Sequence, residues 1–177
     1  MRLLIDIKAE KDFSYDVMYY HKLQGFVYSL IRNTEYEKLH DKKGYKFFCF
    51  SNIFPCSQNK SIHVGDRKQF IIASPDKMLI SIIKERMEKM RRDEFSVGNM
   101  LFSISNIKSV NPIIMDNCVI KTATPIIMRI PKYMYETYGI KSDYDYVFWR
   151  PEHDFNAFLK QLSENLIKNT MNFITKI

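Results

Sequence analysis

Residues 42–50, KKGYKFFCF, contain the stretch that decides how the chain folds. Phe47, Phe48 and Phe50 follow a glycine and precede a polar loop, a pattern typical of a β-strand over residues 47–51. The segment before it, TEYEKLHDKK (34–43), is too polar to contain another strand. We therefore expect 47–51 to be the second strand of its sheet.

The residues before this stretch predict one strand and one helix. Leu3, Ile5 and Ile7 alternate within RLLIDIK (2–8), as in a strand with one buried face. In YDVMYYHKLQGFVYSLIRN (15–33), apolar residues recur three and four apart, which predicts a helix with one buried stripe. That stripe consists of Leu23, Phe26, Val27, Leu30 and Ile31.

The residues after the stretch predict a strand, a helix and a strand. KQFIIAS (68–74) is the third strand, and Ser74-Pro75 provides an N-cap followed by a proline at the first helical position. The helix is expected to run to about Arg92 and to bury Leu79, Ile82, Ile83, Met87 and Met90. NMLFSISNIKSV (99–110) alternates as a fourth strand. The order β-α-β-β-α-β predicts an α+β, ferredoxin-like (RNA-recognition-motif-like) domain over residues 1–110.

A second unit is expected over residues 111–177. CVIKTATPIIMRIP (118–131) has an extended pattern, with Pro125 at an edge or a bend. A helix is predicted within residues 150–169, with an apolar stripe of Phe155, Phe158, Leu159, Leu162 and Leu166. We interpret this half as an incomplete second ferredoxin-like domain, because these residues and Phe173 lack strands to cover them. Since exposed apolar patches tend to associate, a homodimer through this region is expected.

The composition is that of a folded, basic protein. Hydrophobic residues make up 46% of the chain, and a formal net charge of +7 with a pI near 9.2 favours polyanionic partners. Three cysteines without a CxxC pair indicate reduced thiols, and Cys49, Cys56 and His63, spaced by seven, fit no common zinc pattern. A secretory signal and an apolar run of ~18 residues are both missing from the sequence. We expect a cytoplasmic protein that uses neither membrane, metal nor cofactor.

The stretch 42–50 also nearly matches the base-stacking strand of RNA-recognition motifs, basic-Gly-aromatic-small-aromatic. In that motif the strand is the third, at the centre of the sheet, and the first strand offers a second aromatic residue. Here it is the second strand, at an edge, and RLLIDIK has no aromatic residue. Simple base stacking on the sheet is therefore disfavoured, and Lys46, where the motif has Gly or Ala, needs another explanation.

The predicted helix at 15–33 has a second face. His21, Gly25, Tyr28 and Arg32 are spaced by four, three and four residues, so they align beside the buried stripe. A glycine in mid-helix costs about 0.5–1 kcal/mol relative to alanine, so Gly25 indicates close approach by another element or by a nucleic-acid strand. From spacing alone, Tyr28 is also consistent with a tyrosine at the edge of the core.

His40 lies in the polar link before the second strand, and Lys46 at its start. A phenol, an imidazole and an ammonium near one cleft suit metal-free RNA cleavage. One group takes or orients the 2′-hydroxyl proton, one protonates the leaving 5′-oxygen, and a cation stabilises the charged phosphorane. From spacing alone, His40 is also consistent with an ordinary surface histidine, and Lys46 with an ordinary solvated lysine.

HKLQGFVYSLIRN followed by KLHDKKGYKFFCFSNIFP resembles the CRISPR-associated repeat-cleaving endoribonucleases, the Cas-six family. The family has a Leu-Gln-Gly-x-x-Tyr helix, a histidine in a short loop, and Gly-x-Lys entering a Phe-rich strand. These read here as Leu23 to Tyr28, then His40, then Gly44 to Lys46. Similarity continues through QFIIASPDKMLISII and TATPIIMRIP and covers the whole chain.

The resemblance implies tandem ferredoxin-like domains and metal-independent cleavage of CRISPR repeat RNA to a 2′,3′-cyclic phosphate and a 5′-hydroxyl. It implies a catalytic triad of Tyr28, His40 and Lys46. Histidine suits the general acid, because its ordinary pKa is about 6.5, whereas a phenol with a pKa of about 10 is only ~0.1% ionised at pH 7. Candidate RNA contacts are Lys42, Lys43, Arg32 and His21.

Beyond the RNA, the resemblance makes a CRISPR effector complex a candidate partner. The family's glycine-rich, RNA-contacting loop in the second domain is not found among these 177 residues, which include five glycines. A non-catalytic RNA-binding or scaffold protein of the same fold is therefore the alternative.

Overall fold

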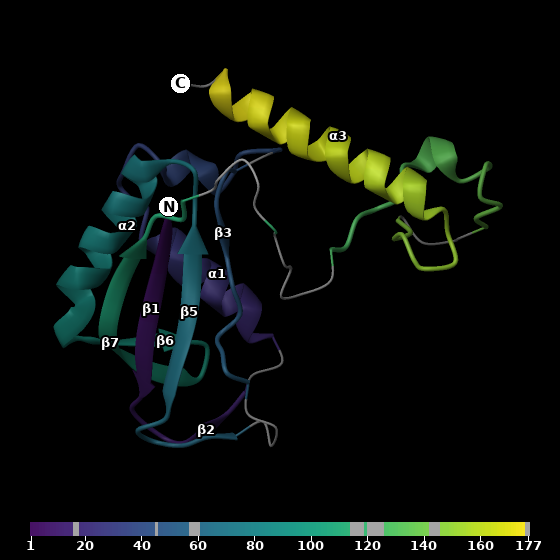
Figure 1. The fold of residues 1–177 in the computed structure, drawn as a ribbon. Coiled ribbons are helices and arrows are strands. Elements are labelled where there is room, and N and C mark those ends of the chain that lie inside the picture. The colour runs from purple at the N-terminus through teal and green to yellow at the C-terminus, as the bar shows by residue number, and fades with distance from the viewer. Residues whose placement is uncertain are drawn as a thin grey trace. The chain divides into compact units, whose positions relative to one another are not determined.

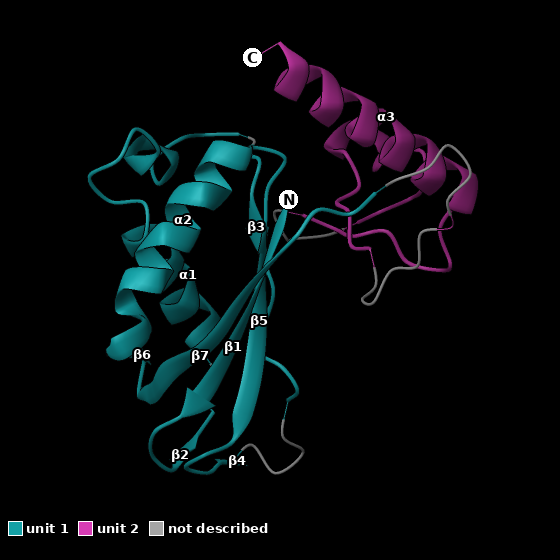
Figure 2. Ribbon diagram, turned by 60° about the vertical axis from the view of Figure 1, so that its left-hand side comes forward, with its two compact units in different colours: residues 1–114 teal, residues 115–177 magenta. Residues whose placement is uncertain are grey.

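Strand β1 (Arg2–Ala9) lies inside the sheet of the first half of the chain, because its alternating pattern buries Leu3, Ile5 and Ile7 completely. The computed structural model describes residues 1–15, 18–44, 46–56, 61–113, 119, 126–141 and 146–175. The chain divides into two units, Met1–Ile114 and Met115–Ile177, coloured separately in Figure 2.

The described residues of unit 1 form a five-stranded antiparallel sheet in the order β3-β5-β1-β7-β6. Strands β3 (Cys49–Phe50), β5 (Arg67–Ala73) and β7 (Met100–Val110) join β1 in the ferredoxin-like order (Figure 1). The predicted α+β, ferredoxin-like fold class is confirmed, with the second strand at the sheet edge. The sheet also contains β6 (Glu94–Val97), a strand that was not predicted and that pairs with β7 as a hairpin.

Strand β3 is shorter than the predicted 47–51, and its start explains the difference. Phe47 has a φ of 53°, in the left-handed region that a phenylalanine rarely adopts. The backbone therefore turns at Phe47 and becomes extended only at Cys49. A hydrogen bond from the Ser74 hydroxyl to the Phe47 carbonyl, at 2.7 Å, holds this turn against β5.

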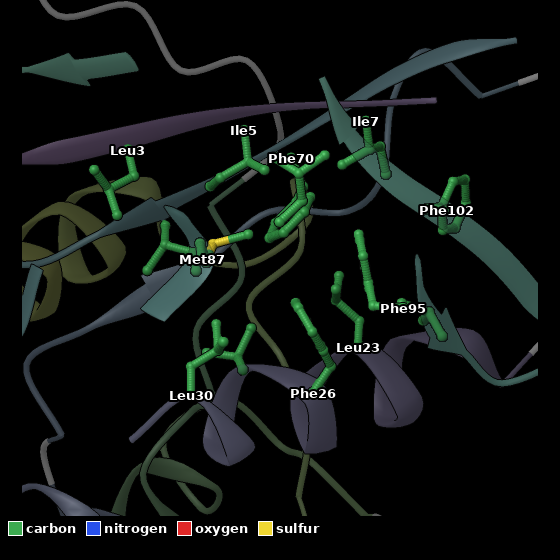
Figure 3. Packing of buried hydrophobic residues seen from close by; sticks show 14 of the residues in the cluster. Leu3, Ile5, Ile7, Leu23, Phe26, Leu30, Phe70, Met87, Phe95 and Phe102 are labelled. Carbon is green, nitrogen blue, oxygen red and sulfur yellow. The ribbon is translucent and has the colours of Figure 1, made fainter. Parts of the chain in front are cut away.

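Helices α1 (Tyr19–Ser29) and α2 (Lys77–Lys89) contribute the other side of the core. In Figure 3, Leu23, Phe26 and Leu30 of α1 point toward the sheet side chains Ile5, Ile7 and Phe70. All five residues of the predicted α1 stripe are buried. For α2 the prediction was partly wrong: Leu79, Ile83 and Met87 are buried as expected, but Ile80 is buried as well, while Ile82 and Met90 are half-buried. The last turn tightens into the 3₁₀ segment η2 (Met90–Arg92).

The start of α2 also differs from the prediction, which placed the N-cap at Ser74. The cap is Asp76, whose carboxylate accepts from the Met78 and Leu79 amides at 2.9 and 3.1 Å. The Ser74 hydroxyl instead accepts from the amide of Asp76, two residues later in the chain. A carboxylate satisfies two otherwise unpaired amides of the first turn, so Asp76 is the more effective cap.

The remaining elements of unit 1 are short. Strands β2 (Phe13–Ser14) and β4 (Ser61–Ile62) pair as a separate two-stranded ladder. A 3₁₀ turn, η1 (Glu37–Leu39), lies between α1 and β3.

In unit 2 the described residues contain a 3₁₀ turn, η3 (Lys132–Met134), a bridge between Arg129 and Phe148, and helix α3 (Phe155–Ile174). Half of the extended segment expected at 118–131, including Pro125, lies outside the described residues. The helix is confirmed, capped by Asp154, and none of its described residues is buried. Phe155, Leu159 and Leu166 are exposed, whereas Phe173 is half-buried. Over the described ranges, no helix is both long and apolar enough to cross a bilayer.

We predict that Asp76→Ala lowers the free energy of unfolding of unit 1 by about 1 kcal/mol, because two α2 amides lose their acceptor. Far-UV circular dichroism during urea unfolding measures the loss. Fluorescence of Trp149, the chain's single tryptophan, follows unit 2 and should be unchanged. Asp154→Ala, which removes the equivalent cap of α3, is the matched control and should instead lower the midpoint of the transition followed by Trp149 fluorescence. A Trp149 transition that shifts equally in both variants would contradict separate caps.

The same carboxylate also accepts a hydrogen bond from the Tyr36 hydroxyl at 2.9 Å. Burial, followed by this hydrogen bond, raises the pKa of Tyr36 from 10.0 to about 12. Because the neutral phenol is the favoured form, its contribution to stability is complete below pH 10 and disappears as the pH rises to about 12.

Candidate active site

Tyr28 is positioned by the last turn of α1, next to the buried stripe. Val27 and Leu30 on either side of it are buried, which fixes the helix against the sheet. The Tyr28 side chain is half-buried, and its ring meets the Phe48 ring edge-on, with centroids 5.7 Å apart. The phenol is therefore held at the rim of the core, with its hydroxyl available to neighbouring polar groups.

His40 reaches the same place from the turn η1. Its backbone amide donates to the Glu37 carbonyl at 3.1 Å and ends the turn. The imidazole lies edge-to-face against the Tyr28 ring, with centroids 4.9 Å apart and planes at 78°. Its side chain is 65% exposed, so it is open to a substrate from solvent.

Lys46 joins these two residues. Its ammonium donates to the Tyr28 hydroxyl at 2.9 Å and to the His40 carbonyl at 2.8 Å. Gly44, with a φ of 91°, makes the preceding turn at little steric cost and brings the lysine back toward α1. The structure thus gathers Tyr28, His40 and Lys46 into one cluster, while the role of each stays a prediction.

The imidazole has a carboxylate partner that the sequence patterns did not indicate. His40 Nδ1 lies 2.7 Å from Asp41 Oδ1. Because a carboxylate can only accept, this hydrogen bond assigns a proton to Nδ1 and leaves Nε2 for a substrate. Asp41 is 89% exposed, so its charge is screened by water, and its main effect is on the orientation of the ring. In the part of the chain that the structure describes, no three His, Cys, Asp or Glu residues are grouped as metal ligands.

The four predicted RNA contacts differ in how exposed they are. His21 and Arg32 are exposed on α1 and directly after it, on the two sides of Tyr28 along the chain. Lys43 is exposed in the loop before Lys46. Lys42 is half-buried, with its ammonium 5.4 Å from the centre of the Phe47 ring. Whether these four residues bind RNA stays a prediction.

Gly25 faces open space between His21 and Tyr28. A Cβ atom built at this glycine would meet no heavy atom of the described chain within 4 Å. Of the two reasons that the sequence suggested for a mid-helix glycine, close approach by another element of the described chain is therefore wrong. Close approach by a nucleic-acid strand stays a prediction.

Comparison with known proteins finds two curated relatives with similar sequence identity to this chain. The chain is 32% identical over 170 residues to the CRISPR-associated endoribonuclease Cas6 of Haloferax mediterranei, covering 94% of this chain and 61% of the relative. It is 30% identical over 169 residues to the CRISPR-associated endoribonuclease Cas6 2 of Methanocaldococcus jannaschii, covering 95% and 64%. The chain thus spans less than two thirds of the length of these relatives. No protein-family model matches it.

Solved structures agree on the fold. A Cas6-related protein from Pyrococcus furiosus superposes with a TM-score of 0.61 at 22% identity, covering 87% of this chain and 63% of that one. A structure described as a RAMP protein binding different RNA substrates superposes with a TM-score of 0.60 at 19% identity, covering 93% and 68%. The resemblance to the repeat-cleaving endoribonuclease family that the motifs before residue 55 indicated is confirmed.

Proposed function

We propose that this chain carries the catalytic centre of a metal-independent endoribonuclease that processes CRISPR repeat RNA. The observation that supports the proposal best is the pair of hydrogen bonds from Lys46, to the Tyr28 hydroxyl and to the His40 carbonyl. They place a phenol, an imidazole and an ammonium together in a chain whose curated relatives are named CRISPR-associated endoribonucleases.

The reaction is an internal transesterification. The 2′-hydroxyl oxygen of the RNA attacks the adjacent phosphorus and loses its proton, and the bond from phosphorus to the 5′-oxygen breaks. His40, protonated at Nε2, donates a proton to that leaving oxygen. The products are a 2′,3′-cyclic phosphate and a 5′-hydroxyl, and no water is consumed in this step.

Tyr28 orients the attacking hydroxyl in this proposal. The ionised phenol, whose oxygen accepts from the Lys46 ammonium, takes the proton that the 2′-hydroxyl loses. Phenols are largely un-ionised near neutral pH, so we expect slow turnover.

Lys46 has a second role through its remaining N–H. An ammonium has three donors, and two are used by Tyr28 and the His40 carbonyl. The third is available to a non-bridging oxygen of the phosphorane, where negative charge increases in the transition state. A cation so placed contributes to both binding and rate.

We predict that this chain cleaves a CRISPR repeat RNA in EDTA and that His40→Ala abolishes cleavage while repeat-RNA affinity stays within a few-fold. A general acid acts mainly in the transition state, so its loss affects rate far more than binding. Denaturing electrophoresis measures cleavage, and filter binding measures affinity. Lys46→Ala is the contrasting variant, expected to lower both.

Three outcomes would contradict parts of this proposal. RNA retained but not cut by the unmodified chain would support the alternative, a non-catalytic RNA-binding or scaffold protein. An equal loss of binding and rate in His40→Ala would make His40 a contact residue. Cleavage that requires added metal would exclude the metal-independent mechanism.

We also propose that unit 2 mediates self-association, because α3 exposes apolar side chains on a helix without buried residues. Phe155 is 66% exposed and Leu166 is 59% exposed, and patches of this kind favour association. Light scattering at micromolar concentration should show a dimer, and Leu166→Ser combined with Phe155→Ser should increase the monomer fraction. A monodisperse monomer of the unmodified chain would refute this proposal. A CRISPR effector complex stays a further candidate partner.

A further inference from the structure

A second aromatic pair lies at the opposite end of α1 from Tyr28. Tyr20, in the first turn, stacks on Phe50 of β3, with ring centroids 5.0 Å apart and planes at 23°. Tyr20 is 41% exposed and Phe50 is half-buried. Because β3 is an edge strand, the described sheet places no strand beyond this pair.

Helix α1 and residues 46–50 lie side by side and link this pair to the candidate active site. At one end Lys46 and Phe48 contact Tyr28, and at the other Phe50 contacts Tyr20. Eight helical residues correspond to about 12 Å at a rise of ~1.5 Å per residue. A single strand with a stacked rise of ~3.4 Å covers that distance in roughly two to four nucleotides.

The first turn of α1 is exposed next to Tyr20. His21 and Lys22, directly after Tyr20, are both exposed. Exposed aromatic faces bind unstacked bases of any sequence, and basic residues along the path bind the phosphates. The overall charge of +7 favours a polyanion over an apolar ligand or an acidic peptide.

We propose that the Tyr20–Phe50 pair is a base-stacking subsite for single-stranded RNA, two to four nucleotides from the scissile phosphate. The proposal rests on the proposed function and extends it, because it assigns a role to a residue pair that the proposed triad does not include. In this proposal Phe50 of the Phe-rich strand supports base stacking through its contact with Tyr20 of α1, and the base does not bind on the surface of the sheet.

The test measures binding of a fluorescein-labelled 12-nucleotide oligouridylate in EDTA by fluorescence anisotropy. Tyr20→Ala should weaken binding roughly 5- to 100-fold, the range expected for loss of one stacked base. Tyr20→Phe keeps the ring and should bind within two-fold of the unmodified chain. Tyr133→Ala removes an 82% exposed tyrosine of unit 2 and is the matched control, expected to have no effect.

One further variant separates stacking from folding. Tyr20→Leu covers Phe50 without offering an aromatic face, so it should fold normally by circular dichroism and bind as weakly as Tyr20→Ala. Full affinity in a folded Tyr20→Leu would overturn the subsite.

The two proposals fail in different ways. If the unmodified chain cuts repeat RNA and Tyr20→Leu binds and cuts equally well, the subsite is wrong and the proposed function stands. If the unmodified chain never cuts repeat RNA but loses oligouridylate binding with Tyr20→Leu, the function is wrong and the subsite stands as an RNA-binding surface.

Discussion

The candidate site depends on the hydrogen bonds of one ammonium group. Tyr28 is fixed by a helix packed on the core, whereas His40 belongs to a short turn and is mostly exposed. Lys46 connects the two through bonds of 2.9 and 2.8 Å to the tyrosine hydroxyl and the histidine carbonyl. Lys46 thus fixes the backbone of His40, while Asp41 and an edge-to-face contact with Tyr28, which contributes about 1 kcal/mol, orient the imidazole. The geometry of the cluster therefore depends on Lys46, on Asp41 and on the turn at Gly44.

One face of helix α1 packs in the hydrophobic core, and another face carries residues of the candidate site. Its buried stripe packs on the sheet, while the adjacent face presents His21, Gly25 and Tyr28 to solvent. A mid-helix glycine lowers helix stability by about 0.5–1 kcal/mol, which a core of fully buried residues such as Leu23 and Phe70 can offset. The same helix carries Tyr28, the proposed catalytic phenol, and Tyr20, the proposed stacking residue, about 12 Å apart along its axis.

Periodicity alone predicted the ferredoxin-like order and the α1 stripe, because both follow from local apolar spacing. It missed β6, whose four residues are too few for a clear pattern, and overestimated β3, because nothing in FFCF reveals the left-handed Phe47. The helical spacing of Tyr28 and Gly25 was readable from sequence. The Lys46 bonds were not, because they depend on how the loop after η1 returns to the helix.

In the proposed mechanism the RNA's own 2′-hydroxyl is the nucleophile at this cluster. Replacing the single ribose 5′ to the scissile phosphate of a repeat RNA with deoxyribose, and mapping the products in EDTA, tests this role. We expect no cleavage at that bond with binding retained, and a 2′,3′-cyclic phosphate end from the unmodified RNA. Cleavage of the substituted RNA at the same bond, or a product with an ordinary 3′-hydroxyl, would contradict the mechanism and the roles given to Tyr28 and His40.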